Sequence, residues 1–224
     1  MSAVFITSTG TDIGKTFVAR GLIRALRAHG RNVAALKPIV SGFEPTEAAG
    51  SDSGLLLKAL GRPVSMETIA EISPWRFALP VAPDMAAARE GRTLDFPGTV
   101  EFCRAAIAAN HDSLLIEGAG GVMSPIDNDY TNLDWMRALD VPVILVAGSY
   151  LGTISHTLTG LDVLMRHSLK VAALVISESA DSPVKLDETC SAIARFATDV
   201  EIIAVPRLAG KIEHSAFERI AERL

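Results

Sequence analysis

Residues 4–17 read VFITSTGTDIGKTF, and the first unit of the fold can be predicted from them. An apolar run comes first, then a turn rich in threonine and glycine, then Lys15 and Thr16 at the start of an amphipathic segment that reaches residue 29. This order is typical of a strand, a phosphate-binding loop and a helix. In such a loop backbone N–H groups face the phosphates, the lysine supplies a mobile positive charge, and the threonine hydroxyl ligates Mg²⁺.

The loop departs from the usual phosphate-loop pattern at one position. That pattern places its first glycine five residues before the glycine of the Gly-Lys-Thr triplet, and Thr9 stands there. A plain strand-to-helix turn with an incidental Gly-Lys-Thr remains the alternative. Partitioning-type ATPases carry an extra lysine five residues before the main one. Gly10 occupies that position here, which argues against that class.

The remainder of the chain repeats the same alternation of strands and helices. Further strands are predicted at residues 33–36, 113–116, 143–146, 171–176 and 201–205. Helices are predicted at residues 53–60, 98–109, 133–139, 154–167, 186–196 and 211–223. The strand segments are continuously apolar, as in a parallel sheet that is covered on both faces. We therefore predict an α/β fold: one doubly wound, mostly parallel sheet of the P-loop NTPase type with helices on both faces.

The stretch of residues 61–97 is the least regular part of the sequence. It contains prolines at positions 63, 74, 80, 83 and 97. We expect it to pass over the sheet edge and not to form a separate domain. The chain, residues 1–224, is therefore predicted to be a single domain.

Composition excludes several classes of function. Apolar residues make up 49% of the 224 residues, which suits a large core, and the formal net charge of −5 offers no electrostatic surface for nucleic acid. No apolar run approaches the roughly 18 residues that a membrane span needs. We expect a cytoplasmic protein without a signal peptide or membrane contact. Cys103, Cys190 and the five histidines show no metal-ligand spacing.

Three charged residues lie where ligands bind in such sheets, at the carboxyl ends of strands or close to them. Lys37 ends the second predicted strand, where it could neutralise charge in phosphoryl transfer. Glu117 ends the third strand before a glycine-rich turn, a position from which a carboxylate helps to hold Mg²⁺. Asp52 precedes a helix, and helix capping would be a sufficient explanation for Asp52 or its neighbours.

Five segments together resemble the dethiobiotin synthetase family. They are TGTDIGKT at residues 9–16, KPIVSG at 37–42, SD at 51–52, EGAGG at 117–121 and GSYLGTISH at 148–156. The resemblance implies formation of the ureido ring of dethiobiotin from 7,8-diaminononanoate, CO₂ (or bicarbonate) and Mg-ATP. One amine forms a carbamate, the carbamate attacks the γ-phosphate to give a carbamic–phosphoric anhydride, and the second amine closes the ring and expels phosphate.

The resemblance also implies roles for individual residues. Lys15 and Lys37 would be catalytic, and Thr16, Asp52 and Glu117 would hold Mg²⁺. Substrate would contact Ser41 and Thr11 and, from the partner subunit of a homodimer, Leu151, Gly152 and Thr153. ATP would contact the phosphate loop and several strand ends, at Asp12, Ile13, Gly14, Lys15, Thr16, Phe17, Asp52, Glu117, Gly118, Ala119, Gly120, Ser177, Pro206, Arg207 and Leu208.

The sequence departs from the family pattern in three places. Ser8 stands where the family usually has glycine, with Gly10 replacing another residue, and Ser177 stands where an adenine-reading asparagine is common. Residues 82–84 read Ala-Pro-Asp where the family often has Ser-Pro-His. Base selectivity is therefore left open. Two rival interpretations also remain: the ATP-binding half of a cobyrinate-type amidase, and a nucleotide switch that acts on a macromolecule. The amidases usually carry an added glutaminase domain with a catalytic cysteine, for which neither cysteine has a suitable context.

Overall fold

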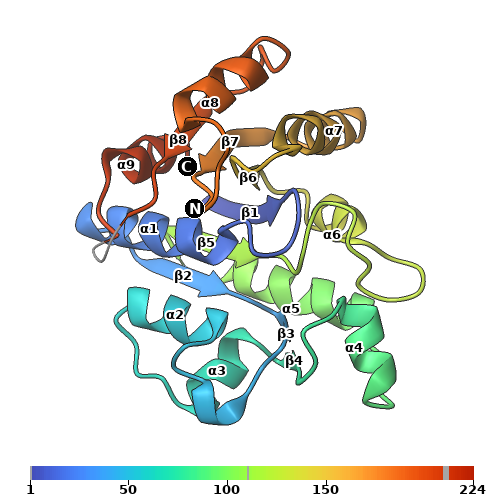
Figure 1. The fold of residues 1–224 in the computed structure, drawn as a ribbon. Coiled ribbons are helices and arrows are strands. Elements are labelled where there is room, and N and C mark those ends of the chain that lie inside the picture. The colour runs from blue at the N-terminus through green and yellow to red at the C-terminus, as the bar shows by residue number, and fades with distance from the viewer. Residues whose placement is uncertain (1, 110, 209–211) are drawn as a thin grey trace.

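The computed structural model describes residues 2–109, 111–208 and 212–224 (Figure 1). Its centre is a six-stranded parallel sheet with the strand order β2-β5-β1-β6-β7-β8. The strands are β1 (Ser2–Ser8), β2 (Val33–Leu36), β5 (Ser113–Glu117), β6 (Val143–Ala147), β7 (Val171–Ser177) and β8 (Ile202–Val205). The predicted fold class is confirmed.

The strands are buried because helices cover both faces of the sheet, and every residue of β5 and β6 is buried. On one side lie α1 (Lys15–Ala28), α2 (Asp52–Ala59) and α9 (Ser215–Ala221). On the other lie α5 (Phe96–Ala108), α6 (Asn132–Leu139), α7 (Thr153–Arg166) and α8 (Leu186–Ala194). None of the helices in the described ranges is long and apolar enough to cross a membrane.

The central strand β1 joins the core to the site. Val4, Phe5 and Ile6 are fully buried, and each such side chain stabilises the fold by about 1.5–3 kcal/mol relative to exposure. The ring of Phe5 meets Trp135 edge-on at 5.1 Å. Because β1 lies between β5 and β6, the loop that follows it opens at the point where the strand order changes direction, which is where ligands bind in such sheets.

Helix α1 packs its apolar face on the sheet and its opposite flank on α9. Val18 and Leu22 are completely buried. A Cβ on Gly21 would lie 2.3 Å from the ring of Phe217, so the two helices approach closely only because this residue is glycine.

The irregular stretch contains more structure than we predicted. It holds α3 (Met66–Ile72), β4 (Trp75–Phe77) and α4 (Pro83–Arg89), and β4 pairs in parallel with β3 (Ile39–Ser41) in a small second sheet. A short 3₁₀ helix (Pro45–Glu47) lies between β3 and α2. The prediction of an irregular excursion was therefore wrong in detail. Strands of three residues give no periodic signal, and their partners lie far apart in the chain.

Other boundaries agree with prediction to within two residues, apart from the last helix. That helix was expected from residue 211, which lies outside the described residues, and α9 begins at Ser215 behind an N-cap at His214. The side chain of His214 accepts the N–H of Ala216. Both tryptophans pack inside the fold, since Trp135 is fully buried and Trp75 meets Phe102 edge-on at 5.7 Å.

Candidate active site

A cavity of about 510 Å³ opens at the carboxyl ends of β1, β2 and β5. It brings together residues from the loop after β1, the end of β2, strand β3, the start of α2 and the loop after β5. Its lining consists of Thr11, Asp12, Gly14, Lys15, Thr16, Lys37, Ile39, Ser41, Asp52, Pro80, Val81, Ala82, Pro83, Glu117, Ala119, Gly120 and Ser124. Eleven of the predicted site residues therefore line one cavity.

The phosphate loop owes its shape to Gly14, which caps the start of α1. Its φ is 106°, a conformation that residues with a side chain rarely adopt. A Cβ there would also lie 2.9 Å from Oγ of Ser177, at the end of β7. The backbone at Gly14 thus passes so close to β7 that only glycine fits, and Lys15 follows at the first helical position.

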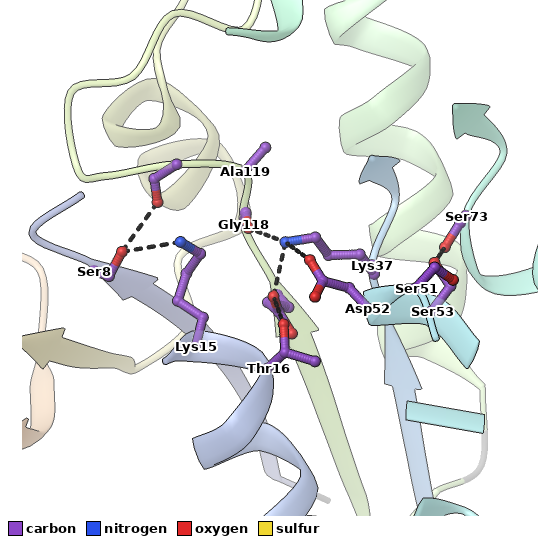
Figure 2. Close-up of polar contacts among 12 residues, drawn as sticks. Ser8, Lys15, Thr16, Lys37, Ser51, Asp52, Ser53, Ser73, Gly118 and Ala119 are labelled. Carbon is purple, nitrogen blue, oxygen red and sulfur yellow. Dashed lines mark hydrogen bonds and ion pairs between the residues drawn. The ribbon is translucent and has the colours of Figure 1, made fainter. Parts of the chain in front are cut away.

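Lys15 is buried against the loop that it follows. Its ammonium donates to Oγ of Ser8 at 3.0 Å (Figure 2). It also donates to the carbonyl of Gly10 at 3.2 Å. Burial, together with the neighbouring positive charge of Lys37, lowers the pKa of Lys15 from 10.5 to about 8. A lysine with this pKa gains its full charge most readily beside an anion such as a phosphate.

Ser8 is the residue through which the two loops meet. Its hydroxyl lies within hydrogen-bond distance of the carbonyls of Gly10 and Gly120, so it links the loop after β1 to the loop after β5. The side chain is completely buried. Sequence reasoning noted Ser8 as a departure from the family pattern but did not assign it a contact.

Glu117 is the centre of the charged part of the site. Its Oε1 accepts a hydrogen bond from Oγ1 of Thr16 at 2.7 Å and another from the ammonium of Lys37 at 2.7 Å. Lys37 also donates to the carbonyl of Gly118 at 2.8 Å and lies 3.6 Å from Oδ2 of Asp52 (Figure 2). These contacts bring together residues from α1, α2 and the ends of β2 and β5.

The two carboxylates determine the charge state of Lys37. Burial alone would lower the pKa of Lys37, but Glu117 and Asp52 outweigh burial and raise the pKa above its usual value. Lys37 is therefore a permanent ammonium ion in the interior. Helix capping was the alternative explanation for Asp52 or its neighbours, and the neighbour Ser51 provides the cap of α2 by accepting the N–H of Gly54 at 3.2 Å. Asp52 stands one residue inside the helix and faces Lys37.

The glycine-rich loop after β5 is held in place from α6. The amide of Asn132 donates to the carbonyl of Gly121 at 2.8 Å and also to that of Ala119. A Cβ on Gly121 would lie 3.2 Å from the backbone of the phosphate loop, so the two loops are in close contact. Asn132 is fully buried, and its supporting role was not predicted because no short motif connects it with the loop.

Ser41 lies at the end of β3 and lines the cavity. Its hydroxyl is buried, and among the described residues it has no hydrogen-bond partner. Thr11 lines the same cavity. The segment at residues 80–83 forms another part of the wall, which the sequence did not predict. A buried hydroxyl without a hydrogen-bond partner is unfavourable unless a ligand supplies that hydrogen bond, so Ser41 is suited to contact a polar substrate.

Other predicted residues lie outside this lining. Ile13 and Phe17 flank the loop, and the Phe17 ring packs on α9. Gly118 contributes its carbonyl to Lys37. Ser177 touches the phosphate loop at Gly14, whereas Pro206, Arg207 and Leu208 follow β8, where the backbone N–H of Arg207 donates to Glu178 at 2.8 Å.

The segment before α7 also lies apart from the cavity lining. Leu151 is 86% exposed, Gly152 caps α7 with a φ of 95°, and the hydroxyl of Thr153 donates to the carbonyl of Gly148 at 2.7 Å. The side chain of Thr153 is therefore occupied within its own loop. Its backbone N–H is occupied as well, because it donates to the carbonyl of Tyr150 at 3.1 Å.

The oxygen atoms around Glu117 suit a hard divalent cation. Thr16, Asp52 and Glu117 offer a hydroxyl and two carboxylates, which are ligands that Mg²⁺ prefers. The buried Oε2 of Glu117 has no hydrogen-bond partner among the described residues, so it is available to a cation. In the described part of the chain no group of three or more histidine, cysteine, aspartate or glutamate side chains could hold a metal ion. A metal here would depend on further oxygen ligands such as phosphates.

Comparison with known proteins agrees with this arrangement. A family model described as an AAA domain matches residues 2–214. The protein named ATP-dependent dethiobiotin synthetase BioD from Methylobacterium nodulans is 48% identical over 215 residues, which cover 94% of this chain and 95% of that protein. The protein of the same name from Phenylobacterium zucineum is 50% identical over 209 residues, with 92% and 89% covered.

Solved structures with a similar fold are more distant. The septum site-determining protein MinD from Pyrococcus horikoshii, complexed with Mg-ADP, gives a TM-score of 0.56 at 16% identity and covers 99% of this chain and 94% of its own. A ParA family ATPase from Chlorobium tepidum gives a TM-score of 0.51 at 14% identity, with 92% and 84% covered. At this level of identity the likeness concerns the fold alone.

Proposed function

The chain belongs to the family of ATP-dependent dethiobiotin synthetases, and we propose that it forms the ureido ring of dethiobiotin from 7,8-diaminononanoate, CO₂ and ATP, releasing ADP and phosphate. The observation that carries this proposal is the convergence of Lys15, Lys37, Thr16 and Glu117 on one cavity. The cavity also contains the hydroxyl of Ser41, which has no hydrogen-bond partner in the described part of the chain. A phosphate loop and a polar substrate wall are what such a reaction needs.

The chemistry requires positioning and charge neutralisation more than covalent help from the protein. One amine of the substrate adds to CO₂ and gives a carbamate. A carbamate oxygen attacks the γ-phosphorus of ATP, the bond to the β-phosphate oxygen breaks, and ADP leaves. The second amine then attacks the carbamoyl carbon and closes the ring. The bond between that carbon and the phosphate oxygen breaks, and phosphate departs.

The lysines are placed to offset the negative charge that accumulates in these steps. Lys15 begins α1 beside the loop whose backbone would wrap the phosphates, and Lys37 enters the cavity from the end of β2. An ammonium that is already held in the interior needs little reorganisation when charge develops next to it. Ser41 is proposed to contact the diamine or its carbamate, with Thr11 nearby.

Magnesium is proposed as the metal that accompanies ATP, held by Thr16, Asp52 and Glu117. Bound there, it would neutralise phosphate charge. The three residues fit this role because their oxygens are hard ligands and Oε2 of Glu117 is unpaired among the described residues. The adenine would lie near Ser177 and residues 206–208, at the ends of β7 and β8.

A homodimer is proposed as the working unit, with one domain per subunit and a cytoplasmic location. The start of α7 would present its backbone N–H groups to the substrate carboxylate in the partner subunit, because a helix amino terminus favours a negative charge. Leu151 and Ile154 support an interface there, since they are apolar side chains that are 86% and 38% exposed in the single chain.

The decisive experiment measures phosphate release from Mg-ATP and bicarbonate with and without 7,8-diaminononanoate. We expect release to depend strictly on the diamine and the product to have the mass of the cyclic urea. A chain that binds ATP but ignores the diamine would not be a dethiobiotin synthetase. ATP hydrolysis that requires a macromolecule instead would favour a nucleotide switch.

A further inference from the structure

Lys37 holds the same carboxylates that are proposed to bind the metal ion. Its ammonium lies 2.7 Å from Oε1 of Glu117 and 3.6 Å from Oδ2 of Asp52. The side chains of Lys37 and Glu117 are 5% and 1% exposed, so water screens this pair very little. The hydroxyl of Thr16, the third proposed ligand, also points to Oε1 of Glu117. The lysine is thus a positive charge in the middle of the proposed ligand set.

The charge around the cavity is nearly balanced without a metal ion. Its lining contains Lys15 and Lys37 against Asp12, Asp52 and Glu117, a formal net charge of −1. Mg²⁺ gives up its hydration shell reluctantly and is usually held by one or two carboxylates together with the phosphates of a substrate. The net charge is only −1, and the carboxylates of Asp52 and Glu117 both contact the ammonium of Lys37. A bare divalent ion should therefore bind weakly.

We infer that Lys37 makes metal binding dependent on the nucleotide. Its ion pairs with Asp52 and Glu117 keep the affinity for the bare ion low, and the phosphate charge of the nucleotide is needed to bring the ion in. This inference rests on the proposed function only in taking a nucleoside triphosphate as the ligand of the phosphate loop. Oε2 of Glu117 has no hydrogen-bond partner within the described ranges, so it gives the incoming ion a point of attachment while Oε1 is still bonded to Lys37.

The inference has a thermodynamic consequence that can be measured without turnover. If the nucleotide increases the affinity for the ion by some factor, the ion must increase the affinity for the nucleotide by the same factor. Removing the charge of Lys37 should tighten binding of the bare ion and so reduce this coupling factor. Replacing Lys37 by another cation should preserve it.

The first measurement uses the unaltered protein. Mn²⁺ binding is followed by electron paramagnetic resonance with and without β,γ-methylene-ATP, which is not hydrolysed, and is corrected for the complex that the two form in solution. We expect the analogue to tighten Mn²⁺ binding by about a hundredfold or more, because its phosphate oxygens add negative charge that attracts the ion. Equal affinity in the two conditions would overturn the inference without any variant.

The second measurement assigns the effect to Lys37. Without nucleotide, Lys37→Gln should bind Mn²⁺ more tightly by at least about tenfold, because one short-range repulsion between the ammonium and the ion is lost. Lys37→Arg should stay close to wild type. Lys15→Gln is the matched control, because Lys15 bonds Ser8 and Gly10 and not the carboxylates. No tightening in Lys37→Gln, or equal tightening in Lys15→Gln, would contradict the inference.

Folding and function are tested separately. Lys37→Gln leaves Glu117 buried without its ammonium partner, so each variant is first compared by thermal unfolding. If Lys37→Gln does not fold, the wild-type titration still tests the coupling, and loss of the coupling in Lys37→Arg, which keeps the positive charge, would contradict the inference. The diamine is absent from every titration, so a protein that fails to make dethiobiotin but shows the metal–nucleotide coupling would disprove the proposed function and leave this inference intact.

Discussion

The hydroxyl of Thr16 donates to Oε1 of Glu117 over 2.7 Å, and this contact joins two residues that are 101 positions apart. Thr16 lies in the first turn of α1, whereas Glu117 is the last residue of β5. The contact therefore ties the phosphate loop to the neighbouring strand. It also sets two proposed metal ligands at a separation that one cation can bridge.

Thr16→Val should raise the Mg²⁺ concentration needed for half-maximal activity roughly tenfold, because valine keeps the shape and removes the oxygen. Thr16→Ser keeps the oxygen and should remain close to wild type. The measurement is a Mg²⁺ titration of diamine-dependent phosphate release at saturating ATP. An unchanged titration in Thr16→Val would remove Thr16 from the proposed ligand set.

Ser8→Ala should weaken nucleotide binding about five- to tenfold. The hydroxyl of Ser8 joins Lys15, Gly10 and Gly120, and one net hydrogen bond contributes about 1 kcal/mol. Thr7→Val is a matched control, because Thr7 is equally buried and its hydroxyl has no hydrogen-bond partner among the described residues. Binding of ADP is measured by calorimetry. Equal effects of the two substitutions would mean that Ser8 acts only through packing.

Nucleotide affinity should fall as the pH rises above about 8. The pKa of Lys15 is lowered to about 8 by burial and by Lys37, so the free protein begins to lose this proton there. Bound phosphate favours the charged lysine, so the complex keeps the proton and binding takes up protons at higher pH. Affinity then decreases with pH, at most about tenfold per unit.

Calorimetry with ADP in metal-free buffers of different ionisation enthalpy measures this proton uptake directly. We expect little uptake at pH 7 and clear uptake at pH 9. Lys15→Arg stays charged throughout this range and should remove the dependence. Wild-type protein that takes up no proton at pH 9 would contradict the lowered pKa.

Gly14→Ala should abolish nucleotide binding or prevent folding. Alanine at a φ of 106° is strained, and its Cβ would lie 2.9 Å from Oγ of Ser177. Gly30→Ala separates the two causes, because Gly30 has a φ of 75° and nothing within 4 Å of an added Cβ. It should cost about 1 kcal/mol of stability and leave ADP affinity unchanged. Thermal unfolding and ADP calorimetry are measured on both variants.

The six-stranded sheet could be predicted because its strands are buried on both faces. Runs such as residues 143–146 are continuously apolar, and this pattern is recognisable even when the exact ends of the strand are not known. The small sheet of β3 and β4 could not be predicted in the same way. Ile39 pairs with Trp75, and strands of three residues depend on tertiary packing and not on local pattern.

The site residues that stand at the carboxyl ends of parallel strands could be predicted from the sequence. Lys37 and Glu117 stand at such ends, and the sequence placed them together correctly. Distances depend on how the elements pack, so the sharing of Glu117 between Thr16 and Lys37 could not be foreseen. Asp52 shows the same limit, since only the structure reveals that Ser51 provides the cap.

Ser41→Ala should raise the KM for 7,8-diaminononanoate about five- to twentyfold with a smaller change in kcat. Its buried hydroxyl lines the cavity without a hydrogen-bond partner among the described residues, so it is free to bond the diamine, and a bond made equally in ground and transition states affects mainly KM. The KM for ATP should be unaffected.

Ser113→Ala is the control, because the hydroxyl of Ser113 is likewise buried and without a hydrogen-bond partner among the described residues but lies at the amino end of β5, away from the cavity. Steady-state kinetics of both variants, with each substrate varied in turn, make the comparison. A diamine KM that changes no more in Ser41→Ala than in Ser113→Ala would place the substrate on another wall of the cavity, and the segment at residues 80–83 would be tested next.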